Sequence, residues 1–171
     1  MEALVPMGCV QERRSVEVPL TEARGYFGRY VRDIEAEASG RIVLTVKVPL
    51  ERLGIDRCVS VSKAVLVYFS PIVEPNAVKQ RMAVSWEPEG GGIFPKFTGT
   101  VGVEAEEMAS ASFITLDGSY DPPLAVIGDA FDAIVGKHIA RQTARNLLDE
   151  IAITMETAFT NEGAGSHENI M

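Results

Sequence analysis

Hydrophobic positions along the chain follow two different periods. In residues 21–37 they recur every three or four residues, which predicts an amphipathic helix that Thr21 can cap. In residues 42–116 they mostly alternate with polar residues, which predicts strands with one buried face. The predicted strands are an edge strand at 14–18 and five further strands at 42–48, 59–69, 82–86, 97–103 and 108–116. The links between them are short and carry proline and glycine, which favours an antiparallel meander.

A second, much longer helix is predicted at 124–159. Pro122 and Pro123 can precede or open its first turn, because proline suits the beginning of a helix. Gly118 is expected to permit a turn at the end of the preceding strand. Tyr120 is expected to pack its ring at this corner with its hydroxyl outward. The stretch is therefore interpreted as a corner that aims the long helix across the sheet.

Length and charge limit the classes of protein to consider. The chain of 171 residues is long enough for one domain with a substantial core. We expect 1–13 to be a flexible lead, 14–159 to form a single domain, and 160–171 to be a flexible tail. The net charge of −8 argues against a nucleic-acid surface, which requires a basic patch.

The sequence also bears on location. No apolar run approaches the roughly 20 residues that a membrane-spanning helix needs, so no membrane span is expected. The beginning of the chain lacks the pattern of a signal peptide. The 2 cysteines do not suggest a disulfide framework. Together these features lead us to expect a cytoplasmic protein.

Side chains suited to catalysis are scarce. Of the 2 histidines, one lies in the predicted tail, which leaves His138 as the candidate structured imidazole. No cluster of His, Cys and carboxylates has metal-ligand spacing, and no phosphate or dinucleotide motif is present, so we expect neither metal nor cofactor. Arg141 and Arg145 are interpreted as the solvated flank of the long helix, although either could counter a carboxylate ligand. The acidic pair Asp149 and Glu150 is likewise interpreted as solvated.

The C-terminal part of the chain carries a recognisable motif. A strand ends in L-x-G-x-Y-x-P-P, and a helix with the pattern G-x-x-x-D-x-x-x-G-x-x-I-A-x-x-T follows. The matching residues are Leu116, Gly118, Tyr120, Pro122, Pro123, Gly128, Asp132, Gly136, Ile139, Ala140 and Thr143. Over residues 95–152 the chain resembles a poorly characterised branch of the START/polyketide-cyclase (SRPBCC) superfamily. The resemblance implies an α+β helix-grip fold, in which a curved antiparallel sheet wraps around a long C-terminal helix with an apolar cavity between them.

The resemblance also suggests a function. Characterised members of that superfamily bind lipids, sterols, polyketides or plant hormones, and some catalyse cyclisation or dehydration. The leading hypothesis is therefore that the chain binds a small hydrophobic or amphipathic molecule in the cavity between the sheet and the long helix. The expected ligand-binding residues are Tyr68, Trp86, Tyr120, Phe131 and His138. For Trp86 the simpler interpretation is a core anchor.

Two alternatives stay open. The first is a cyclase- or dehydratase-type enzyme, whose acid–base group would be Tyr68, Tyr120, His138 or Asp117. The second is a homodimeric interaction protein without a ligand, whose interface would use the apolar stripe of the long helix. The irregular segment 41–57 also leaves the order of the first strands open.

Overall fold

The computed structural model describes residues 8–36, 41–49, 58–72, 80–91, 94–105, 110–121 and 129–165. These parts contain six strands and two helices. In chain order the elements are β1 (Gly8–Val16), α1 (Leu20–Ala36), β2 (Arg41–Pro49), β3 (Cys58–Pro71), β4 (Gln80–Pro88), β5 (Lys96–Ala105), β6 (Ser112–Asp121) and α2 (Asp129–Gly165). The two helices correspond to the two predicted from the hydrophobic period. The predicted beginning of the second helix, at 124–128, lies outside the described residues.

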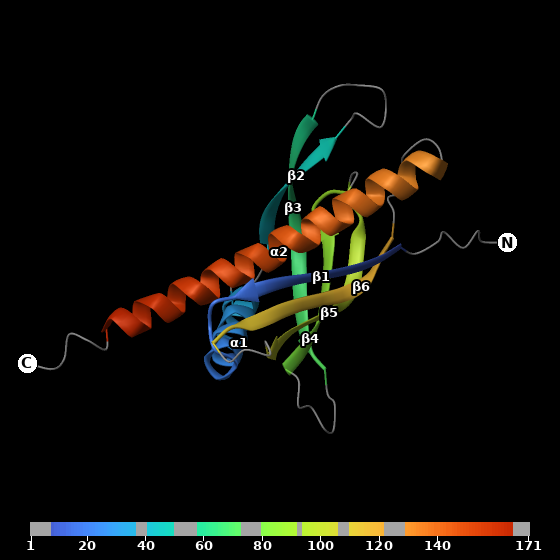
Figure 1. Cartoon of the computed structure of the whole chain (residues 1–171). Coiled ribbons are helices and arrows are strands. Elements are labelled where there is room, and N and C mark those ends of the chain that lie inside the picture. The colour runs from blue at the N-terminus through green and yellow to red at the C-terminus, as the bar shows by residue number, and fades with distance from the viewer. Residues whose placement is uncertain are drawn as a thin grey trace, which may run out of the picture.

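All six strands form one antiparallel sheet, and α2 crosses one of its faces (Figure 1). The strand order β1-β6-β5-β4-β3-β2 places β1 and β2 at opposite edges. Strands β2 to β6 follow one another as a meander, whereas β1 adds at the far edge beside β6. This order resolves the question that segment 41–57 left open. The architecture is the predicted α+β helix-grip fold.

One row of residues runs across five neighbouring strands on the face toward α2. The register pairs Val67 with Trp86, Trp86 with Phe97, Phe97 with Tyr120, and Tyr120 with Gly8. All four side chains of this row are buried. The rings of Trp86 and Phe97 stack with centroids 3.9 Å apart and planes 9° from parallel. This aromatic row forms part of the floor beneath the helix.

α2 turns a stripe of apolar side chains toward the sheet. Its fully buried apolar residues recur at helical spacing, which is the pattern of a helix with one core-facing side. They are Ile139, Ala140, Ala144, Leu147, Leu148, Ile151, Ala152 and Met155. Several are alanines, so the helix axis can approach the sheet closely along this stripe.

α1 packs beside the C-terminal half of α2 (Figure 1). The ring of Tyr26 contacts Phe159 of α2 edge to face, with centroids 6.2 Å apart. The ring of Tyr30 contacts Phe69 of β3 in the same way, at 6.3 Å. α1 therefore joins the long helix to the sheet at this end of the molecule.

Gly118 lies inside β6 rather than at a turn, so the expectation of a turn there was wrong. It pairs with Gly99 of β5, and the ring of Phe97 lies over both glycines. A Cβ atom at Gly118 would come within 2.5 Å of Phe97 Cζ. The absent side chains therefore make room for the aromatic ring and for the neighbouring backbone of the paired strand. Tyr120, expected to direct its hydroxyl outward, is only 5% exposed and lies against Gly8.

Both ends of the described chain extend the regular structure beyond the predicted limits. β1 begins at Gly8, because residues 8–13, expected to be a flexible lead, continue the ladder with β6. α2 continues to Gly165, and Glu162 in its last turns accepts hydrogen bonds from Tyr26 and Arg29 of α1, both at 2.7 Å. These long-range contacts order segments whose own composition predicts little structure.

Candidate functional site

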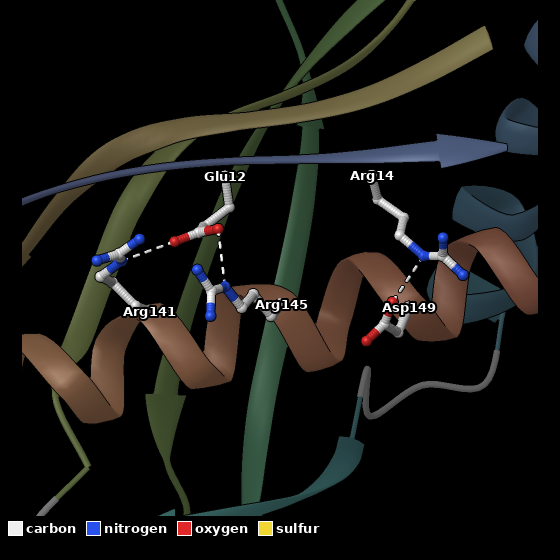
Figure 2. Close-up of polar contacts among 5 residues, drawn as sticks. All are labelled: Glu12, Arg14, Arg141, Arg145 and Asp149. Atoms are coloured by element: carbon white, nitrogen blue, oxygen red, sulfur yellow. Dashed lines mark hydrogen bonds and ion pairs between the residues drawn. The ribbon is translucent and has the colours of Figure 1, made fainter.

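An acidic residue of β1 holds α2 at one edge of the sheet. Glu12 accepts hydrogen bonds from Nε of Arg141 at 2.8 Å and from Nε of Arg145 at 2.9 Å (Figure 2). Its side chain is only 9% exposed. Burial would raise the pKa of the Glu12 carboxyl, but the hydrogen bonds and charges of the two arginines hold that pKa below its usual value. The two arginines therefore pair with a carboxylate of their own chain. We name Glu12, Arg141 and Arg145 together the Glu12 clamp.

Further polar contacts lie next to the clamp. Arg14 of β1 contacts Asp149 of α2 at 2.7 Å (Figure 2), and both side chains are about half exposed. At the other edge of the sheet, Nδ2 of Asn146 donates to the backbone carbonyl oxygen of Thr45 in β2 at 2.6 Å. α2 is therefore tied by polar contacts to both edge strands of the sheet.

Two buried polar atoms lack hydrogen-bond partners within the described part of the chain, one on the inner face of the sheet and one on the buried side of α2. The indole Nε1 of Trp86 projects from the sheet side, and the hydroxyl Oγ1 of Thr143 belongs to the buried side of α2. Neither atom has a hydrogen-bond partner among the described residues. Buried polar atoms in folded proteins are nearly always hydrogen-bonded. These two are therefore the atoms in this region most in need of a partner.

The five predicted ligand-binding residues do not all lie together. Trp86 and Tyr120 belong to the aromatic row on the face toward α2. His138 lies half-buried on α2. Phe131 also belongs to α2, but its side chain is outside the described part of the structure. Tyr68 is 50% exposed and lies between the buried residues of β3, hence on the opposite face of the sheet, away from the predicted cavity.

The groups suggested for acid–base catalysis are similarly divided. Asp117 alternates with the inward-facing Leu116 and therefore lies on the outer face of the sheet, as Tyr68 does. Tyr120 lies on the inner face, where burial, and to a lesser extent the nearby Cys9, raises the pKa of its hydroxyl. Asp117, Tyr68 and Tyr120 therefore do not lie together at one site.

A groove that the sequence did not indicate runs between β2 and α2. It has a volume of about 480 Å³ and opens to solvent beside the contact between α2 and Thr45. Val43 and Ile153 form its apolar part, and Asp149, Glu150 and Thr154 contribute polar atoms. The expectation that Glu150 is a solvated helix residue was wrong, because it is half-buried in this groove. The alternation of side chains along β2 marks Val43 as an apolar residue that points outward. This was the available sequence signal for the groove.

Glu150 has an unusual environment for a helix carboxylate. Its Oε1 accepts a long hydrogen bond of 3.4 Å from the hydroxyl of Tyr30. Burial raises the pKa of the Glu150 carboxyl, and the hydrogen bond from Tyr30 only partly opposes this effect. Burial likewise raises the pKa of the Tyr30 hydroxyl, with the neighbouring negative charge adding to the effect. The pair therefore remains a neutral phenol beside a carboxyl that is held less acidic than usual.

Within the described residues, no group of three or more His, Cys, Asp and Glu side chains is placed to hold a metal ion. Among the described helices, none is long and apolar enough to cross a membrane.

Comparisons with known proteins bear on the fold. No protein-family model matches the chain, and neither does any curated protein. Among solved structures, TTHA0849 from Thermus thermophilus superposes with a TM-score of 0.51 at 12% identity, covering 88% of this chain and 99% of its own. A START superfamily protein from Mycobacterium smegmatis gives 0.42 at 12% identity, covering 90% and 97%. An aromatase/cyclase from Streptomyces sp. R1128 gives 0.38 at 10% identity, covering 92% and 93%.

These comparisons establish a likeness of fold and nothing finer. The likeness to TTHA0849 extends over nearly the whole of both chains, which sequence identity of 12% did not reveal. The likeness agrees with the helix-grip architecture described above. Because one fold can carry many activities, function has to be argued from the site itself.

Proposed function

We propose that the protein binds a small apolar or amphipathic molecule between the inner face of its sheet and α2. The observation that carries this proposal is the pair of unpartnered buried atoms, Trp86 Nε1 and Thr143 Oγ1. An unsatisfied buried polar group costs about 1–3 kcal/mol, and a ligand that supplied the missing hydrogen bonds would recover part of that cost. The aromatic row beside Trp86 offers an apolar surface for the rest of the molecule.

The chemistry of the two atoms narrows the ligand. An indole N–H only donates, so Trp86 requires a hydrogen-bond acceptor such as a carbonyl, ether or hydroxyl oxygen. A threonine hydroxyl can donate and accept, so Thr143 tolerates either kind of partner. The proposed ligand therefore combines an apolar body with at least one oxygen acceptor.

Native mass spectrometry of gently purified protein, compared with the mass after denaturation, tests the proposal. We expect an additional mass of about a few hundred daltons that is lost on denaturation, which is the usual size of a small-molecule ligand. A bare chain that also fails to bind the amphipathic probe 8-anilinonaphthalene-1-sulfonate would contradict the proposal. A clean dimer of bare chains would instead favour the homodimeric interaction protein.

A matched pair of substitutions links the bound mass to the proposed site. Thr143→Val removes the buried hydroxyl while keeping the shape of the side chain, and we expect it to lower the fraction of protein that carries the additional mass. Thr160→Val makes the same change at an exposed position of the same helix, outside the groove between β2 and α2, and should leave that fraction unchanged. In ligand-free protein, Thr143→Val should raise the free energy of unfolding by about 1 kcal/mol. A decrease would mean that the hydroxyl already has a partner.

A further inference from the structure

We propose that the groove between β2 and α2 is a second binding site, which takes a small organic cation with a short apolar chain, such as a protonated alkylamine. This site differs from the one between the sheet and α2. It opens to solvent at the β2 edge, and its volume of about 480 Å³ is in the range of sites that hold small molecules.

The charge of the occupant follows from the two carboxylates on the groove wall. Asp149 is already paired with Arg14 through its Oδ1. Glu150 has no cationic partner among the described residues, and only its Oε1 accepts a hydrogen bond, from Tyr30. An anion would be repelled here, whereas an ammonium group placed at Oε2 of Glu150 would neutralise a half-buried charge. The net charge of −8 also attracts cations to the protein, which adds to the local preference of the groove for a positive charge.

The apolar part of the occupant follows from the other wall. Val43 is 60% exposed and Ile153 is 59% exposed, which makes them two of the three large hydrophobic side chains found exposed among the described residues. Both line the groove beside Glu150. A short alkyl chain lying on these two side chains would remove their surface from water, at roughly 25 cal/mol per Å² of apolar area. A carboxylate beside two exposed aliphatic side chains thus matches a cation that carries an aliphatic chain.

The hydrogen-bonding state of the remaining groove residues agrees with a donor-rich occupant. Thr154 donates its hydroxyl hydrogen to the backbone carbonyl of Glu150 at 2.9 Å, which leaves its oxygen lone pairs available as acceptors. Asn146 uses its amide nitrogen on the backbone of β2, so its carbonyl oxygen also remains an acceptor. An ammonium group has three donors and no acceptor, and therefore complements these oxygens.

Titration of the folded protein with hexylammonium chloride, followed by backbone amide NMR shifts, tests this site. We expect shifts concentrated at Val43, Thr45 and the α2 residues of the groove. Hexanol and sodium hexanoate carry the same alkyl chain without the positive charge. Hexanol should bind at least about tenfold more weakly, and hexanoate should not bind measurably. Shifts confined to residues outside the groove, or equal binding of hexanoate, would overturn the proposal.

Variants separate charge from alkyl contact. Glu150→Gln should weaken hexylammonium binding by about tenfold or more, whereas Glu35→Gln, at an exposed position of α1 outside the groove, should leave it unchanged. Val43→Ser should weaken binding without altering the preference for the cation over hexanol. Unchanged affinity in Glu150→Gln would overturn the proposal. So would binding of a lysine-rich peptide by a protein that ignores hexylammonium, because the groove would then serve a protein partner.

Discussion

The Glu12 clamp should contribute measurably to the stability of the fold, and the change Glu12→Gln tests this. The carboxylate is 9% exposed, whereas the side chains of Arg141 and Arg145 are 47% and 51% exposed. Hydrogen bonds to charged groups contribute about 1.5–3 kcal/mol when buried. Exposed ion pairs contribute about 0.2–1 kcal/mol. With one buried and one half-exposed partner, each contact falls between these limits at about 1 kcal/mol, so the substitution should cost about 2 kcal/mol.

Urea denaturation followed by the fluorescence of Trp86, the 1 tryptophan of the chain, measures this cost. Glu35→Gln is the matched control, because it removes one negative charge from a chain of net charge −8 without removing a contact of the clamp. The midpoint of Glu12→Gln should fall, and the slope of the transition should stay the same. Equal midpoints for Glu12→Gln and Glu35→Gln would refute the reasoning.

The same variant should show a characteristic dependence on pH. The pKa of the Glu12 carboxyl is lowered in the folded protein from its usual value of 4.5. Its contribution is therefore fully present above about pH 4.5 and is lost as the pH falls through the lowered value. The difference in unfolding free energy between wild type and Glu12→Gln should shrink over that interval. A difference that does not shrink at all before the protein unfolds in acid would mean that the carboxylate charge is not what holds the arginines.

Three other predictions concern packing, protonation and the exposed ion pair. Gly118→Ala should destabilise the protein by about 1–3 kcal/mol, because its Cβ would meet the ring of Phe97. Gly25→Ala in α1 has free space for the added methyl group and should stabilise the protein by about 0.5–1 kcal/mol. Thermal unfolding compares the two variants. Since burial raises the pKa of Glu150, its charge lowers stability as the pH rises above about 4.5. Glu150→Gln should therefore gain stability relative to wild type as the pH rises above about 4.5 in urea titrations, and a pH-independent difference would contradict this. Arg14→Gln should cost less than about 1 kcal/mol, because both partners of its ion pair are half exposed.

The alternation of hydrophobic residues was sufficient to predict the central strands and the faces they bury. Val84 and Trp86 in β4, and Phe97 and Val101 in β5, are all buried on the predicted side. Periodicity cannot supply the register between strands, because that depends on how each connection closes. The stacking of Trp86 on Phe97 follows from the register and therefore became visible only in the structure.

The same rule fails at β1 for a physical reason. Its inward positions include Val10 and Val16, but also Glu12 and Arg14, whose charged groups reach side chains of α2. A pattern that assigns charged residues to the solvent face therefore detects only the end of this strand. Gly118 misleads in a similar way, because a glycine that makes room for an aromatic ring has the same sequence signature as a glycine in a turn.

The adjacent acids of α2 show why the groove could not be predicted from the sequence. Consecutive residues of a helix point about 100° apart, so Asp149 and Glu150 must meet different surroundings. Asp149 meets Arg14 of β1, and Glu150 meets Tyr30 of α1, and both partners are more than one hundred positions away in the chain. One acid is thereby neutralised, and the other is left half-buried without a cation among the described residues. This difference between two identical charges is what gives the groove its selectivity for a positive ligand, and it arises entirely from tertiary contacts.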